Sequence, residues 1–206
     1  MRLFLIRHGR TQANSEKKLV GQKYDGDLTE FGIKQVQKLA CELTNKQISV
    51  IFTSPLIRAK HSADILNRGF AHKTQVIIEE EAIERDYGEF ELLNRNDLKA
   101  KKEAMGLKTE DITNFFPNNL GGVETRNNVF RRIQLSLNMA RTNYGENSVI
   151  AYVTHAGVIY SLITESLGIS EERKSPFTIY EAGFLECNVD IHNILEIITL
   201  WNNPLQ

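Results

Sequence analysis

Two arginines and two histidines in this chain follow directly on runs of apolar residues. Arg7 and His8 come after the run at residues 3–6, Arg58 comes shortly after the run at 49–55, and His155 ends the run at 148–155. Charged and polar side chains are costly to bury. Either these runs are ordinary strand ends that meet water, or they deliver four chemical groups to one site.

These residue types, with Glu84 in the acidic stretch that follows a further apolar run, fit phosphoryl transfer. Arginine presents a planar fork that grips phosphate or carboxylate oxygens. A neutral histidine acts as a nucleophile or base, and a glutamic acid can protonate a leaving group. Helices that begin near Gly9 and Gly157 would add backbone N–H donors for an anion. Together, the two arginines, the two histidines and Glu84 predict phosphoryl transfer through a histidine, without a metal.

A metal site is the alternative use of two histidines and a carboxylate. Each of these groups has an arginine close in the predicted arrangement, and an arginine repels a cation. Cys41 and Cys187 have no CxxC neighbour and build no metal framework. We therefore expect no metal and no cofactor. The remaining histidines are expected to be structural or exposed: His61, His72 and His192.

The apolar runs must be strands for this arrangement to hold. Their continuous Val, Ile and Leu composition favours a parallel sheet that is covered on both faces, with strands at residues 3–6, 49–55, 75–82 and 148–155. Helical periodicity alternates with them, at residues 28–46, 124–141 and 157–168. Ligands in such sheets bind beyond the carboxyl ends of the strands, which is where the polar groups lie.

The alternation predicts an α/β fold, a three-layer α/β/α sandwich with a mostly parallel central sheet. Residues 177–189 and 193–201 read as a hairpin-like addition to that sheet. The polar stretch at about residues 90–122 differs in composition and is expected to be a small helical cap insertion. The whole chain, residues 1–206, is then a single domain.

Composition excludes several classes of protein. The chain has 206 residues and a net charge of -1, with 41% hydrophobic and 25% charged residues. Nucleic-acid and membrane-surface proteins usually carry a basic excess, so neither partner is expected. The first apolar run is too short for a signal peptide or a membrane span. A cytoplasmic location is the default.

Five segments in order resemble the motifs of the histidine phosphatase superfamily, the phosphoglycerate mutase-like family. They are LIRHGRTQAN, SPLIRAKHSADIL, AIERDYGEFE, GGVET and VTHAGV. The resemblance implies that His8 is the nucleophile, that Arg7 and Arg58 clamp the phosphoryl oxygens, and that His155 stabilises the transferring group. Glu84 is then the proton donor to the leaving oxygen. One departure is Leu92, where the family pattern continues with Gly.

The resemblance also assigns supporting roles. Asn14 is a further phosphate or substrate donor, and Thr11 supports the loop after His8. The loop at residues 19–27 and the cap are expected to set specificity. The candidates to touch the leaving group are Gln22, Tyr24 and Arg85. Phe115 and Phe116 could form an apolar wall of the cap. Other charged residues nearby are expected to be solvated: Glu89, Glu91, Lys99, Lys101 and Lys102.

Three functions remain open at this point. The favoured one is a phosphatase that hydrolyses small phosphorylated metabolites. A cofactor-dependent mutase is the alternative, although its family members carry a longer insert after the acid, and Glu89 would repel a second substrate anion. A non-catalytic phospho-ligand binding module is disfavoured because all five core groups are present. The sequence leaves the substrate and the oligomeric state open, a homodimer included.

Overall fold

A six-stranded sheet forms the centre of the protein in the computed structural model, which describes residues 1–106, 120–169 and 178–205. The strand order is β3-β2-β4-β1-β5-β6. The strands are β1 (Arg2–Arg7), β2 (Val50–Thr53), β3 (Gln75–Ile78), β4 (Val149–Thr154), β5 (Phe184–Val189) and β6 (Leu195–Trp201). The four predicted strands and the C-terminal hairpin are therefore present.

The sheet is mostly parallel, as expected. β4 lies between β1 and β2 and pairs in parallel with both, and β2 pairs in parallel with β3. β5 joins β1 in the antiparallel sense, and β6 follows as an antiparallel hairpin. Parallel neighbours need crossover connections, which place helices over the two faces of the sheet. The carboxyl ends of β1, β2 and β4 therefore meet at one edge.

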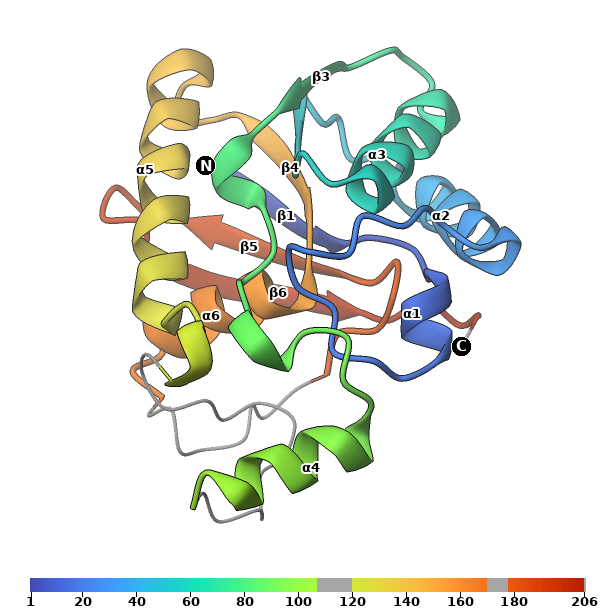
Figure 1. Ribbon diagram of the computed structural model, residues 1–206. Helices are drawn as coiled ribbons and strands as arrows, with labels where there is room; N and C mark the ends of the chain where they lie inside the picture. The colour runs from blue at the N-terminus through green and yellow to red at the C-terminus, as the bar shows by residue number, and fades with distance from the viewer. Residues whose placement is uncertain (107–119, 170–177, 206) are drawn as a thin grey trace.

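Helices cover both faces and complete the α/β/α sandwich (Figure 1). α5 (Arg126–Tyr144) and α6 (Ala156–Ser166) pack in one apolar core, and α2 (Glu30–Leu43) and α3 (Ile57–Gly69) pack in the other. The sequence prediction missed α3. Its signal is the buried series Ala59, Ala63 and Leu66, which recurs at helical spacing.

The third strand is shorter than predicted. It ends at Ile78, and residues Glu80–Ala82 form the 3-10 helix η1 instead of extending the strand. The carboxylate of Glu79 accepts the backbone N–H of Glu81 and so caps this turn. Its other oxygen accepts a 2.6 Å hydrogen bond from Ser136 of α5. A side chain that caps a turn competes with the strand ladder, which is why the strand stops there.

The start of the cap region contains one regular helix, α4 (Arg95–Ala104), which lies beyond the sheet edge (Figure 1). Leu98 packs with Tyr87, Phe90 and Val123 in a small cluster separate from the two main cores. Phe115 and Phe116, expected as a cap wall, lie outside the described residues. No helix in the described parts of the chain is long and apolar enough to cross a membrane.

Leu92, where the family pattern has Gly, adopts a left-handed backbone conformation with φ of 65°. Its N–H donates to the carbonyl of Leu19 over 2.8 Å, which holds the backbone in place. Left-handed backbone costs an L-residue roughly 1–2 kcal/mol. The chain therefore keeps the turn geometry that a glycine would adopt freely, at a cost in stability.

We predict that the usual preference for Ala over Gly reverses at this position. Leu92→Gly should be about 1 kcal/mol more stable than Leu92→Ala, because only glycine adopts this φ without strain. At Lys99, in the middle of α4, Ala should be more stable than Gly by about 1 kcal/mol. Urea unfolding of the four variants measures both differences. Ala more stable than Gly at both positions would contradict the strain at Leu92.

Candidate active site

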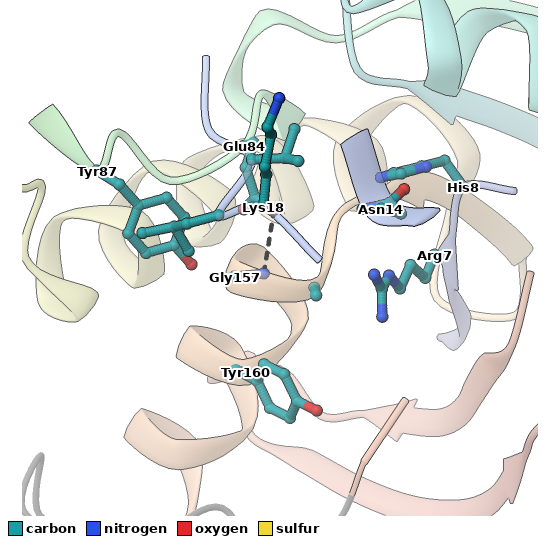
Figure 2. Close-up of a pocket in the computed structure, with 11 residues that line it drawn as sticks. Arg7, His8, Asn14, Lys18, Glu84, Tyr87, Gly157 and Tyr160 are labelled. Atoms are coloured by element: carbon teal, nitrogen blue, oxygen red, sulfur yellow. Dashed lines mark hydrogen bonds between the residues drawn. The ribbon is translucent and has the colours of Figure 1, made fainter. Parts of the chain in front are cut away.

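The predicted polar groups meet at the carboxyl edge of the sheet, where Figure 2 shows Arg7, His8 and Glu84 around one pocket. Arg7 is the last residue of β1, and the backbone N–H of His8 donates to the carbonyl of Thr154 over 3.0 Å. This bond continues the pairing of β1 with β4 and brings His8 beside His155. The two imidazole rings lie with their centroids 5.1 Å apart. The sheet itself therefore sets the spacing of the two histidines.

His8 is held in a defined tautomer. Its Nδ1 lies 2.7 Å from the carbonyl oxygen of Gly9. A carbonyl oxygen only accepts, so Nδ1 carries the proton and Nε2 keeps its lone pair. Burial, together with the charges of Arg58 and Arg7, lowers the pKa of His8 well below its usual 6.5. The ring is therefore neutral at neutral pH, with Nε2 able to attack an electrophile.

His155 is fully buried at the start of α6. Its Nε2 lies 2.7 Å from the hydroxyl oxygen of Ser54, which follows β2. That hydroxyl accepts the N–H of Leu56, so its proton is available to the imidazole. Burial, then the charge of Arg58, lowers the pKa of His155 well below its usual value. His155 is thus a second neutral imidazole, fixed through one of its two nitrogens.

Glu84 is a buried carboxyl group suited to hold a proton. Its oxygens accept the backbone N–H of Arg85 over 2.7 Å and of Gly157 over 3.3 Å. Burial raises the pKa of Glu84, in spite of these bonds and the charge of Arg58. Gly157 has to be small here, because a Cβ would lie 2.5 Å from both the Glu84 carboxylate and the Tyr87 hydroxyl. The first turn of α6 therefore holds the carboxyl group of Glu84 in place.

An ion pair that the sequence did not reveal supports the segment that carries Glu84. Arg132 of α5 donates to both carboxylate oxygens of Glu124, over 2.9 and 3.2 Å, and to the carbonyls of Glu81 and Glu84. Glu124 in turn accepts the N–H of Asp86. Glu124 belongs to the GGVET motif, so this motif contributes support for the acid.

The two arginines are held by the protein through their terminal nitrogens. Arg7 donates to the carbonyl of Ile179 over 2.9 Å and to Glu181 over 2.7 Å. Arg58, with no exposed surface, donates to the carbonyls of Gly21 and Tyr24. Arg58 thus fixes the loop at residues 19–27 as well as contributing charge to both histidines. The sequence did not identify Glu181 as a partner of Arg7.

Thr11 and Asn14 form a capping box at the start of the short helix α1 (Gln12–Ser15). The amide oxygen of Asn14 accepts from both the N–H and the hydroxyl of Thr11, over 3.1 and 2.9 Å. The amide NH₂ of Asn14 is then the group left to donate to a ligand. Thr11 therefore orients Asn14 and supports the loop after His8.

The residues expected to touch a leaving group form hydrogen bonds within the protein, and their contact with a leaving group stays a prediction. Gln22 donates to the carbonyl of Glu84 over 2.7 Å, and the Nε of Arg85 donates to the carbonyl of Glu124 over 2.6 Å. The carbonyl of Tyr24 accepts from Arg58. These bonds tie the loop at residues 19–27 and the GGVET motif to the acid-bearing segment.

Two of the residues expected to be solvated are buried. Glu91 is 9% exposed and accepts the backbone N–H groups of Gln22 and Lys23, since loop donors there need an acceptor. Lys102 is 3% exposed because it follows Leu98 by one helical turn on the inner face of α4. Glu89 is exposed as expected and pairs with Lys101 over 2.8 Å.

A cavity of about 150 Å³ joins these groups. Arg7, His8, Asn14 and Glu84 line it, and so does Gly157 at the start of α6 (Figure 2). The sequence analysis did not identify its other polar lining residues, which are Lys18, Tyr87 and Tyr160. Arg58 and His155 are not among the lining residues, but both lie next to His8. No group of three or more potential metal ligands occurs among the residues that the structure describes.

Comparison with known proteins agrees with this geometry. A family model described as histidine phosphatase superfamily (branch 1) matches residues 3–203. The uncharacterized phosphatase PhoE of Bacillus subtilis is 30% identical over 172 residues, 83% of this chain and 80% of that protein. A 2,3-bisphosphoglycerate-dependent phosphoglycerate mutase of Rhizobium etli is 37% identical over 102 residues, 48% of each chain. The α-ribazole phosphatase from Shigella flexneri matches in structure with a TM-score of 0.76 at 25% identity, over 98% of this chain and 97% of that one.

The tautomer of His8 gives a prediction that is independent of any substrate. In the ¹⁵N NMR spectrum of histidine-labelled protein at pH 6.5, His8 should show a protonated Nδ1 and an unprotonated Nε2. The buried ring resists charging beside two arginines, and Gly9 accepts the Nδ1 proton. The His8→Gln variant assigns the signal by its loss. A doubly protonated ring at this pH would contradict the lowered pKa, and an Nε2–H tautomer would contradict the bond to Gly9.

Proposed function

We propose a mechanism and a substrate class for this chain, which belongs to the histidine phosphatase superfamily, branch 1, and is a phosphoric monoester hydrolase. The substrate is a small phosphomonoester. The reaction passes through a phosphohistidine on His8 and uses no metal. The observation that carries this proposal is the bare Nε2 of a neutral, buried His8, held by the carbonyl of Gly9 in the cavity that Glu84 also lines.

Three buried polar atoms support an anion as the ligand. Nε of Arg7, Nε of Arg58 and Nδ1 of His155 have no hydrogen-bond partner in the described part of the chain. Buried polar groups without partners are rare and costly, and these three belong to residues that lie next to His8, which favours a ligand there. All three can donate, and a phosphoryl group offers three oxygens that accept. Phosphoryl transfer is catalysed mainly by positioning of the group and by positive charge that stabilises its oxygens.

The first half of the reaction uses His8 and Glu84. Nε2 of His8 forms a bond to phosphorus while the bond from phosphorus to the ester oxygen breaks. That oxygen takes the proton of Glu84, whose pKa is raised by burial so that the acid form is available. The alcohol leaves, and the phosphoryl group remains on His8.

Water completes the reaction. It attacks phosphorus as the bond to Nε2 breaks, and it gives its proton to the Glu84 carboxylate, so both residues return to their starting forms. A mutase would instead pass the phosphoryl group to a second substrate molecule. Release of inorganic phosphate, measured beside formation of any new phosphoester, distinguishes the two. The Glu89 argument against a second substrate anion does not hold, because Glu89 pairs with Lys101 and does not line this cavity.

Glu84→Gln tests the acid through the leaving group. With propyl phosphate, whose alkoxide needs a proton, we predict a loss in kcat of about 10²- to 10⁴-fold. With p-nitrophenyl phosphate, whose phenolate leaves unprotonated, the loss in formation of phosphohistidine should be much smaller. Single-turnover release of the alcohol in the presence of EDTA isolates this step.

Glu89→Gln is the matched control, since Glu89 is an exposed carboxylate that pairs with Lys101 and does not line the cavity. It should leave both rates within about twofold of wild type. An equal loss with both esters in Glu84→Gln would contradict the acid role. Loss of wild-type activity in EDTA would contradict a metal-independent reaction.

A further inference from the structure

Arg7 is held at the phosphoryl pocket by a turn of the chain that lies just before β5. Its Nη1 donates to the carbonyl of Ile179 over 2.9 Å, and its Nη2 donates to the carboxylate of Glu181 over 2.7 Å. Its Nε is buried and has no hydrogen-bond partner in the described part of the chain. A guanidinium group is planar and rigid, so partners on two nitrogens fix the direction of the third N–H.

The carboxylate of Glu181 bridges two arginines. One oxygen accepts from Arg7, and the other accepts from Nη2 of Arg10 over 3.1 Å. Although burial acts to raise it, the charges of Arg7 and Arg10 lower the pKa of Glu181 below its usual value. Glu181 is therefore ionised at neutral pH and stays paired with both arginines.

The turn that carries Glu181 has a strained backbone. Ala182 adopts a left-handed conformation with φ of 53°, which is unfavourable for an L-residue. Its N–H donates to the carbonyl of His8 over 3.0 Å, and the N–H of Arg7 donates to the carbonyl of Gly183 over 3.0 Å. Strain of this kind persists only where the surrounding structure fixes it. The end of β1 therefore holds the turn that in turn holds Arg7.

The other side of the turn is anchored as well. The hydroxyl of Tyr160, which lines the pocket together with Arg7 (Figure 2), accepts the N–H of Ile179 over 3.3 Å. The side chain of Asn202, next to the end of β6, accepts the N–H of Tyr180 over 2.9 Å. Contacts from α6, from β1 and from the end of β6 thus fix the turn in place.

The charge of Glu181 does not explain its place beside the pocket. A carboxylate near a bound anion repels it, so by charge alone Glu181 weakens the binding of a phosphoryl group. The pairing with Arg10 offsets part of that repulsion. What Glu181 contributes is a fixed acceptor for one arm of the Arg7 guanidinium.

We infer that Glu181 is a positioning residue for the reaction, which orients Arg7 so that its Nε donates to the phosphoryl group. This inference rests on the proposed function, and Glu181 acts through Arg7 without touching the substrate. Rates depend steeply on such orientation, since a misplacement of about 1 Å can cost about 10²-fold. Without the carboxylate, Arg7 keeps its charge and loses its fixed direction.

Two substitutions of Glu181 separate its position from its charge. In Glu181→Ala, we expect kcat/KM for p-nitrophenyl phosphate to fall at least about tenfold, because Arg7 is no longer oriented. Glu181→Gln keeps an oxygen that accepts from Arg7 and should recover most of that loss. If the charge of Glu181 were its contribution, both variants would instead bind the phosphoryl group more tightly and show a lower KM.

Glu186→Ala is the matched control. The side chain of Glu186 is 6% exposed and pairs with Arg2 over 3.4 Å and with Lys46 over 3.2 Å, but it does not line the phosphoryl pocket. Its substitution removes a comparable bridge between two cations and should leave kcat/KM within about twofold of wild type. Circular dichroism of each variant at the assay temperature shows that the protein compared is folded.

A double-mutant cycle with Arg7→Ala tests whether Glu181 acts through Arg7. In the Arg7→Ala background, Glu181→Ala should cause no further loss, because the group that it orients is gone. Single-turnover release of p-nitrophenolate, with the enzyme in excess, measures the slow variants. A merely structural role of Glu181 would give the same fractional loss in both backgrounds.

The outcomes also separate this inference from the proposed function. Unchanged or increased kcat/KM in Glu181→Ala, no recovery in Glu181→Gln, or equal losses in the two backgrounds overturns the positioning role. If wild type then still hydrolyses p-nitrophenyl phosphate and His8→Ala does not, the proposed function stands and only this inference fails. If wild type hydrolyses no phosphomonoester, both are overturned.

Discussion

The hydrogen bond from Nδ1 of His8 to the carbonyl of Gly9 is the interaction on which the site depends. It fixes one proton on one nitrogen and so leaves the other nitrogen able to attack. Burial beside Arg7 and Arg58 then keeps the ring from taking a second proton. A bound anion favours protonation of a neighbouring imidazole, and a protonated His8 could not attack. The charges of Arg7 and Arg58 oppose that protonation while they also bind the anion.

Much of the remaining architecture holds the groups that act with His8. Pairing of β1 with β4 places His155 beside His8. The first turn of α6 leaves room for the Glu84 carboxyl group because residue 157 is a glycine. The pair formed by Arg132 and Glu124 supports the segment that carries the acid. The Arg132–Glu124 pair is only 13% and 17% exposed, and the loss of either partner would leave the other charge unpaired. Catalytic geometry and stability are therefore expected to be coupled in this protein.

The sequence predicted the α/β layering and the meeting of Arg7, His8, Arg58, Glu84 and His155, because strand ends are visible in an apolar pattern and parallel strands share a carboxyl edge. The sequence could not show which carbonyl fixes the tautomer of His8, and the structure identifies that of Gly9. The prediction from sequence missed α3, although Ala59, Ala63 and Leu66 recur at helical spacing, and it missed the local turn that Glu79 caps and that ends the third strand. It did not reveal the buried state of Glu91 or the pairing of Arg7 with Glu181, because these depend on contacts between segments distant in the chain.

Direct detection of the phosphorylated nucleophile is the most decisive measurement. Protein mixed with p-nitrophenyl phosphate is quenched in base, where phosphohistidine survives, and is digested with a glutamate-specific protease. The account predicts that the peptide Met1–Glu16 gains the mass of one phosphoryl group on His8, and that the gain disappears on longer incubation as water completes the cycle. Steady turnover with no phosphoryl group on His8 at any time, or turnover that persists in His8→Ala, would contradict it.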